Sequence, residues 1–259
     1  MRLKKIETKA KALPRNNSYR EILFSLMILL MLCSLFVSQL SFASNSTFKT
    51  SDIHKIGYAH QFQNVNFSQA QVAFDNEDYA YSARLLAVLA EGGHVQAQYL
   101  LATQYDAGLG VQKDEKSSFY WYKKAANAGV NIAQHNVAVA YAQGIGVAAS
   151  LYKAMTWWER AAKAGNTDSQ YNLGIIYASG QGGVKPNIKK ALKWWRMAAI
   201  NGDAAAQFNL GALYANGIGF SSRTCEASRW WKKSAANGFV QAELALAVLE
   251  HKIDFDICR

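Results

Sequence analysis

Apolar residues recur with the spacing of a helix over most of the chain. Between residues 154 and 162 the apolar positions follow the order i, i+3, i+4, i+7 and i+8: Ala154, Trp157, Trp158, Ala161 and Ala162. This order places them on one stripe of a helix with 3.6 residues per turn. A second stripe follows, with Leu173, Gly174 and Tyr177 on its inner side. The pattern predicts pairs of helices that each bury one face.

The helix pairs repeat with a nearly constant period. Five glycines mark the register, and successive ones lie 36, 36, 37 and 36 residues apart: Gly93, Gly129, Gly165, Gly202 and Gly238. A glutamine stands five residues after each of the first four, and an alanine stands three residues before every one. A single unit of this length cannot bury its apolar stripe, so the period predicts an all-α solenoid of stacked copies.

Tryptophan marks the second helix of the units. All seven tryptophans fall there, beside alanines and at helical spacing, which favours a buried core over a sugar-binding surface. Gly174 and Gly211 fall in the middle of first helices, where glycine costs about 1 kcal/mol relative to alanine. We expect a neighbouring helix that carries a tryptophan to pack tightly against these two glycines.

The most regular motifs are QYNLG at 170–174, QFNLG at 207–211, GIG at 217–219 and KALKWW at 190–195. In these motifs the chain resembles the Sel1-like repeat family, a relative of the tetratricopeptide class. The resemblance covers about residues 66–253 and implies a right-handed α/α superhelix. It gives an incomplete leading pair at 66–93, repeats at about 93–129, 129–165, 165–202 and 202–238, a half repeat at 238–253, and a C-terminal tail at 254–259.

The first 43 residues have the pattern of a secretory signal. A basic segment precedes the apolar run 22–37, and the small residues Ser41 and Ala43 follow it. We expect cleavage after Ala43, a flexible lead-in at 44–65, and a repeat domain that is periplasmic or secreted. The alternative is an uncleaved inner-membrane anchor, which also leaves the repeats outside the cytoplasm.

Charge and cysteine content add two expectations. Half of the formal net charge of +10 lies in residues 1–43, so the remaining domain is only mildly basic. A charge of this size does not indicate binding to nucleic acid. Outside the signal two cysteines remain, Cys225 and Cys258, which predicts one disulfide in an oxidising compartment. The alternative is two unpaired thiols.

The first helices carry two columns of candidate binding residues. In the tetratricopeptide-like class this helix lines the concave side, so the resemblance directs attention to it. The aromatic column is Tyr99, His135, Tyr171 and Phe208, and the amide column beside it is Asn136, Asn172 and Asn209. Aromatic rings next to amides could hold an extended peptide. The alternative is that both columns serve helix packing.

The second helices carry a basic ridge five or six residues before the register glycines: Lys123, Lys124, Arg160, Arg196, Lys232 and Lys233. We expect it on the outer face, either as a solvated surface or as a contact for anionic envelope polymer or lipid headgroups. We recognise neither aromatic interleaving nor a nucleic-acid module, so nucleic acid is not an expected partner.

Enzyme motifs are weak. The five histidines lack metal-binding spacings, and no nucleophile elbow or Walker loop occurs. Ser150 and Lys153 match the S-x-x-K motif of penicillin-recognising enzymes, but the S-D-N and K-T-G elements are absent. The sequence therefore predicts an exported, monomeric, non-enzymatic scaffold that binds a protein or peptide without a cofactor or metal. The alternatives are a cell-wall-related, β-lactam-binding enzyme and a membrane-anchored assembly factor.

Overall fold

The computed structural model of the chain describes residues 65–217 and 223–250. Within these ranges it contains eleven α-helices, one short 3-10 helix and no strand. The all-α prediction is therefore confirmed. The predicted signal at 1–43, most of the lead-in and the tail at 254–259 lie outside the described residues.

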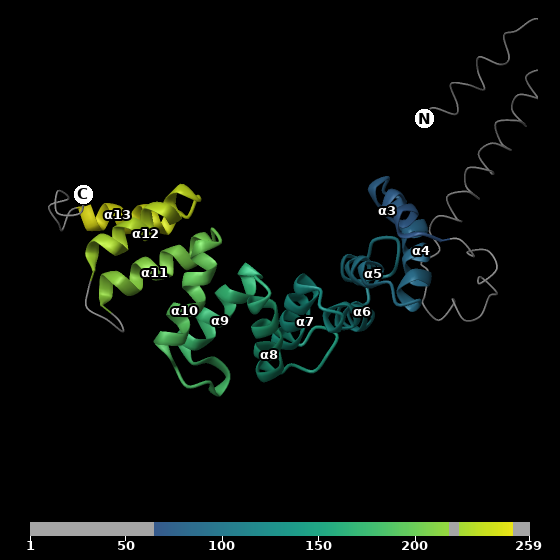
Figure 1. Cartoon of the computed structure of the whole chain (residues 1–259), viewed down its shortest axis with the longest axis horizontal. Helices are drawn as coiled ribbons and strands as arrows, with labels where there is room; N and C mark the ends of the chain where they lie inside the picture. The colour runs from purple at the N-terminus through teal and green to yellow at the C-terminus, as the bar shows by residue number, and fades with distance from the viewer. Residues whose placement is uncertain (1–64, 218–222, 251–259) are drawn as a thin grey trace, which may run out of the picture. The chain divides into compact units, whose positions relative to one another are not determined.

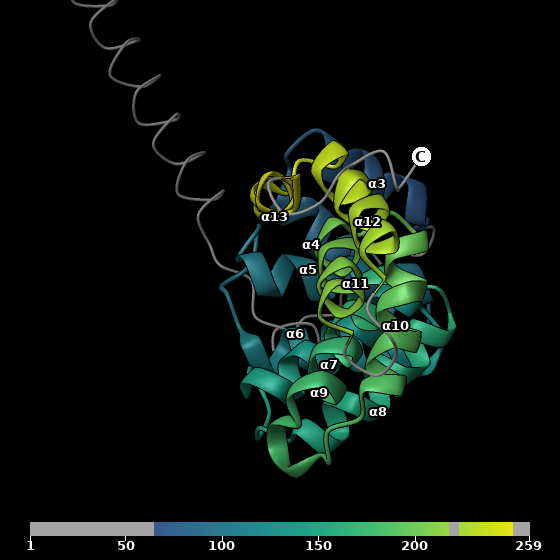
Figure 2. The same cartoon turned by 90° about the vertical axis from the view of Figure 1, so that its left-hand side faces the viewer.

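The four full repeats each contribute two helices of thirteen residues (Figure 1). The first, or A, helices are α5 (Val95–Ala107), α7 (Asn131–Gln143), α9 (Thr167–Ser179) and α11 (Ala204–Asn216). The second, or B, helices are α6 (Glu115–Asn127), α8 (Leu151–Lys163), α10 (Ile188–Ile200) and α12 (Thr224–Ala236). The helices that pack most closely are neighbours in sequence, as both views show (Figures 1 and 2).

Shorter elements flank the four repeats. A leading pair consists of α3 (Phe67–Asp75) and α4 (Tyr79–Glu91), and α13 (Val240–Glu250) follows the last repeat. The 3-10 helix η3 (Gln181–Gly183) lies in the turn between α9 and α10. None of the described helices is both long and apolar enough to cross a membrane.

Glycines end the helices, as their register predicts. Each A helix is followed by a left-handed glycine with φ between 64° and 78°: Gly108, Gly144, Gly180 and Gly217. The register glycines after the B helices have φ between 82° and 96°. Only glycine adopts these angles without a steric penalty, which explains why both columns recur in every repeat.

The tryptophans of the B helices pack in the core together with alanines, leucines and tyrosines. Six of them expose 8% or less of their surface: Trp121, Trp157, Trp158, Trp194, Trp195 and Trp231. Trp230 is only half-buried. Alanines on the same stripe, such as Ala154 and Ala191, are fully buried. The expectation of a tryptophan core is confirmed for these six residues.

The two mid-helix glycines make room for tryptophan rings. A Cβ atom on Gly174 would lie 2.2 Å from Cδ1 of Trp195, and one on Gly211 would lie 2.4 Å from Cδ1 of Trp231. With that close approach, Nε1 of Trp195 donates a hydrogen bond to the carbonyl of Tyr171 at 3.2 Å. Nε1 of Trp231 donates to the carbonyl of Phe208 at 3.1 Å. The predicted tight contact between glycine and tryptophan is therefore confirmed.

The repeat before these has alanine at the glycine position. Ala138 of α7 corresponds to Gly174, and Trp158 of α8 corresponds to Trp195. Nε1 of Trp158 is buried and lacks a hydrogen-bond partner among the described residues. The two repeats thus differ at this position by one methyl group, and the indole forms a hydrogen bond only in the repeat that has glycine there.

The recurring glutamines join consecutive repeats. Each donates from Nε2 to the carbonyl of the alanine three residues before the register glycine, at 3.0–3.2 Å: Gln98, Gln134, Gln170 and Gln207. The Oε1 atoms of Gln170 and Gln207 accept from the side chains of Asn201 and Asn237, one repeat further on. Oε1 of Gln134 is buried without such a donor among the described residues.

Replacing Ala164 with asparagine should supply the missing donor. Ala164 ends α8 with φ −82° and ψ 6°, nearly the angles of Asn201 at the end of α10, so asparagine fits there without strain. We expect Ala164→Asn to raise the free energy of unfolding by about 1 kcal/mol, the usual net value of one such bond. Urea denaturation of both proteins measures this. Since Gln134→Ala removes the acceptor, it should abolish the gain, and a gain that persists would contradict the assignment.

Candidate functional site

The structure places the aromatic column on the A helices, half-buried beside the core. Tyr99 lies 5.8 Å from Tyr122, measured between ring centroids. Phe208 lies 6.3 Å from Trp231 and 5.2 Å from Phe239. Burial raises the pKa of the Tyr171 hydroxyl, Asp203 raises it further, and a hydrogen bond from Asn209 opposes both. These side chains pack on the core with one edge and leave the other edge exposed.

The amide column is partly committed to internal bonds. The side chain of Asn136 hydrogen-bonds to the Tyr122 hydroxyl, and that of Asn209 bonds to Tyr171. Asn172 is half-buried in the same column. Two of the three amides therefore hold tyrosines in place, which is a packing role.

His135 departs from the aromatic pattern of its column. Its Nδ1 atom lies 2.9 Å from the Ser169 hydroxyl of the next A helix. Burial lowers the pKa of His135, and the nearby Asp168 carboxylate acts in the opposite direction. The neutral imidazole thus connects α7 to α9 rather than presenting a charge.

A pocket of about 230 Å³ contains two of the predicted binding residues, His135 and Asn136. Ser118, Phe119 and Tyr122 of α6 line it together with Val139, Ala140 and Ile145. Asp106, in the last turn of α5, and Glu115, the first residue of α6, supply its two carboxylates. Sequence reasoning did not single out Asp106, Glu115 or Tyr122.

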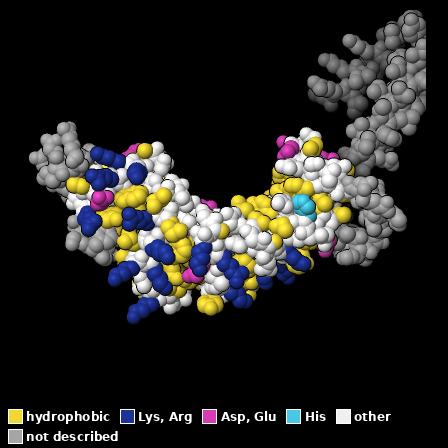
Figure 3. Space-filling view, in the orientation of Figure 1, with side chains coloured by type: hydrophobic (Ala, Val, Ile, Leu, Met, Phe, Trp, Pro, Cys, Tyr) yellow, Lys and Arg dark blue, Asp and Glu magenta, His cyan; other side chains and the backbone are white. Residues whose placement is uncertain are grey.

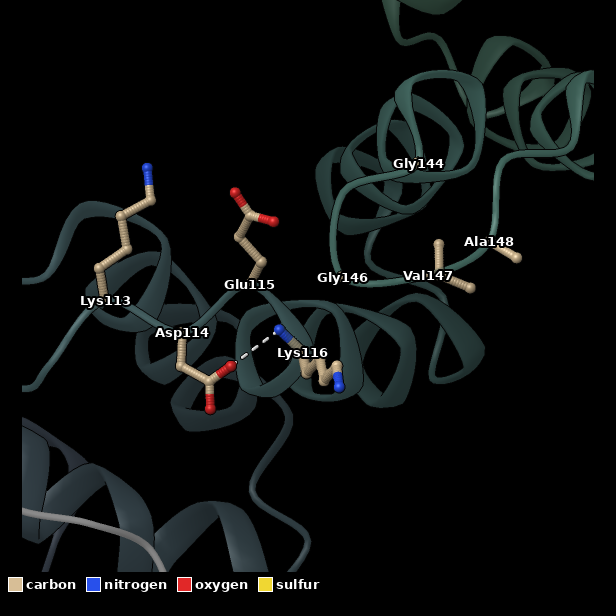
Figure 4. A pocket seen from close by; sticks show the side chains of 8 residues that line it. All are labelled: Lys113, Asp114, Glu115, Lys116, Gly144, Gly146, Val147 and Ala148. Carbon is tan, nitrogen blue, oxygen red and sulfur yellow. Dashed lines mark hydrogen bonds between the residues drawn. The ribbon is translucent and has the colours of Figure 1, made fainter.

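A second depression lies between the start of α6 and the turn after α7 (Figure 4). Charged residues of both signs line it on one side, and Gly144, Gly146, Val147 and Ala148 line it on the other. Asp114 uses its carboxylate to cap α6, accepting from the backbone N–H of Lys116 at 2.9 Å. This region serves as a helix start, and its charges do not converge on one point.

The basic ridge lies along the B helices, and Lys and Arg gather over that part of the surface (Figure 3). The expectation that aromatic residues do not accompany it is wrong. The guanidinium of Arg160 lies 4.6 Å from the ring centroid of Trp157, and Nζ of Lys233 lies 4.7 Å from that of Trp230. Lys123 and Lys124 lie over Phe119 and Tyr120 in the same way. A helix brings residues three and four apart together, which adjacency in sequence conceals. Arg196 and Lys232 are exposed.

Charge divides sharply between the two kinds of helix. The A helices α5, α7, α9 and α11 contain neither Lys nor Arg, and their charged residues are Asp106 and Asp168. Each of the B helices α6, α8, α10 and α12 contains at least three Lys or Arg. The A face is therefore aromatic, amide-bearing and weakly acidic, whereas the B face is basic.

Comparison with known proteins agrees with this repeat geometry. The sequence model of the Sel1 repeat matches residues 95–130, 131–166, 167–203 and 204–239, more than half of the chain. The chain is a Sel1 repeat protein. Proteins of this family generally serve as protein–protein interaction scaffolds and are typically non-catalytic. No curated protein matches the chain.

Several solved structures resemble this Sel1 repeat protein, including one from Oxalobacter formigenes and one from uropathogenic Escherichia coli. A Sel1 repeat protein from Oxalobacter formigenes is 29% identical with a TM-score of 0.64, and the match covers 70% of this chain and 74% of the other. The protein c5321, a protective antigen of uropathogenic Escherichia coli, is 30% identical with a TM-score of 0.63. That match covers 68% of this chain but 38% of c5321.

The S-x-x-K motif of this Sel1 repeat protein has structural roles. The Ser150 hydroxyl caps α8 by accepting from the backbone N–H of Lys153, and Nζ of Lys153 lies 5.4 Å from the ring centroid of Tyr141. The next repeat reproduces both contacts without serine, since Asn187 caps α10 and Lys190 lies over Tyr177. Ser150 and Lys153 are therefore ordinary repeat positions.

Two further expectations for this Sel1 repeat protein are that it binds no metal and that Cys225 and Cys258 form a disulfide. In residues 65–217 and 223–250, no three His, Cys, Asp or Glu side chains come together as a metal site would require. Cys225 lies in the first turn of α12, and Cys258 lies outside the described residues. The bond between these two cysteines stays a prediction.

Proposed function

We propose that this protein is an exported scaffold that holds a segment of another protein along the face formed by its A helices. One observation carries the proposal: the A helices, which contain no Lys or Arg, each carry a half-buried aromatic side chain at the same position of the repeat. Side chains already fixed by packing lose little conformational freedom when a partner binds, which lowers the cost of association.

Internal contacts support this preorganisation. Tyr171 is held by Asn209 of the next A helix, and Tyr99 and Phe208 pack on aromatic residues of B helices. The exposed edges of these rings are available to an extended segment, and aromatic residues are enriched at binding hot spots.

The proposal of export rests on the amino-terminal sequence. A basic segment, an apolar run and the small residues Ser41 and Ala43 follow in the order of a secretory signal. Sequencing the mature amino terminus tests it: a start at Ser44 supports a periplasmic or secreted domain. An intact amino terminus would instead support the anchored alternative.

Partner capture tests the binding face. We expect the full chain to crosslink a discrete partner in envelope extract, and Tyr171→Ala with Phe208→Ala to lower the yield roughly tenfold, as loss of a hot spot does. Both side chains also pack on the core, so circular dichroism must show that the variant is folded at the assay temperature.

A matched control removes two aromatic residues from B helices. Tyr120 and Tyr152 are 48% and 83% exposed, and Tyr120→Ala with Tyr152→Ala should leave capture unchanged. Asn172→Ala, which spares the aromatic packing, should weaken capture. Equal capture by the A-face and B-face variants would refute the proposed binding face.

A further inference from the structure

The pocket at His135 exists because the first full repeat departs from the later ones. Tyr122 occupies the position that holds Trp158, Trp195 and Trp231 in the repeats that follow. Glu115 stands where the next two B helices begin with Leu151 and Ile188. A smaller ring and a carboxylate therefore replace bulky apolar side chains, and space remains between α6 and α7.

The carboxylates of this pocket are not part of the repeat pattern, because later repeats have other residues at these positions. Asp106 is the twelfth residue of α5, and the twelfth residue of each later A helix is an alanine: Ala142, Ala178 and Ala215. Glu115 also lines the neighbouring depression, where Figure 4 shows its carboxylate pointing away from the Asp114–Lys116 hydrogen bond. Among the described residues the one ion pair joins Arg229 and Glu226, so neither pocket carboxylate has a cationic partner there.

The residues that line the pocket carry a net negative formal charge, from Asp106 and Glu115. Asp106 lies in the last turn of α5, where the helix dipole adds further negative charge. The Asp106 carboxylate contributes to raising the pKa of the Tyr122 hydroxyl, after burial, the main cause. Burial keeps His135 neutral, and the residues that line the pocket include neither Lys nor Arg. Lys123 lies over the ring of Phe119, 5.7 Å from its centroid, and Lys116 lines the neighbouring depression.

The apolar part of the pocket matches the rest of a long basic side chain. Phe119, Val139 and Ile145 can cover an aliphatic stem, while Asp106 and Glu115 meet a charged head. A volume of about 230 Å³ falls below the range for drug-sized ligands and suits one side chain. We propose that this pocket binds a Lys or Arg side chain of the partner segment, and thereby sets that segment's register on the A face.

This inference rests on the proposed function, and its test separates the two. The full chain is immobilised and used to select a random peptide library displayed on phage. We expect Lys or Arg to be enriched at one position of the selected peptides. Asp106→Asn with Glu115→Gln should remove that preference and weaken a selected peptide about tenfold, which equals about 1.4 kcal/mol.

Two further variants serve as controls, one that fills the pocket and one that changes the same net charge outside it. Tyr122→Trp fills the pocket with the side chain used by the later repeats while keeping both carboxylates, so it should also remove the preference. Glu91→Gln with Glu243→Gln changes the net charge equally on α4 and α13, outside the pocket, and should keep the preference.

The outcomes are distinct. Selected peptides without enriched Lys or Arg, or an enrichment that survives both pocket variants, would overturn the inference and leave the scaffold in place. Failure of every form of the protein to select any peptide would overturn both proposals.

Discussion

Replacing Trp195 with alanine should lower the free energy of unfolding by about 3–5 kcal/mol, the usual cost of deleting a large buried aromatic side chain. Trp195 is 7% exposed, packs against Gly174 and donates a hydrogen bond to Tyr171. Because each repeat contacts chiefly its neighbours, the loss should also separate the unfolding of the repeats on either side. Urea titration followed by circular dichroism measures both effects.

Trp230 provides the matched control on the next B helix. It is the half-buried tryptophan and carries Lys233 over its ring. Trp230→Ala should cost about 1 kcal/mol, since little surface is transferred out of water there. Equal losses at positions 195 and 230 would show that the stacked core is assigned wrongly.

Replacing Gly174 with alanine should destabilise the protein although alanine is the better helix former. The added Cβ would lie 2.2 Å from the Trp195 ring, so the ring must move and its bond to the Tyr171 carbonyl must lengthen. Overpacking of this kind costs about 1–3 kcal/mol. Thermal unfolding and the indole N–H resonance of Trp195 report on the two effects.

The reverse change at Ala138 should be nearly neutral. Glycine there costs about 1 kcal/mol in helix propensity, but lets Trp158 donate to the carbonyl of His135 and regain about as much. The Trp158 indole resonance should shift towards that of Trp195. A stabilising Gly174→Ala would contradict the role assigned to the glycine.

The sequence alone predicts the parts of this fold that recur. The left-handed glycines, the tryptophan stripe and the contact at Gly174 and Gly211 follow from columns in register, because each repeat meets the same steric demand. The glutamine column is equally visible in the sequence, but its bond to the preceding B helix needs the coordinates.

The candidate site was harder to predict because it consists of exceptions. Tyr122 and Glu115 look unremarkable until they are compared with the tryptophan and leucine of later repeats, and Asp106 meets them only when α5 and α6 pack together. Reading each column for its exceptions would have drawn attention to all three. The amide column shows the opposite case, since Asn136 and Asn209 proved to hold tyrosines.

Oxidative footprinting of the tryptophans, resolved residue by residue by mass spectrometry, tests the stacked-repeat account most directly. The account predicts rapid labelling of Trp230 and protection of Trp121, Trp157, Trp158, Trp194, Trp195 and Trp231 until the protein unfolds. Uniform labelling of all seven tryptophans in the folded protein would contradict it.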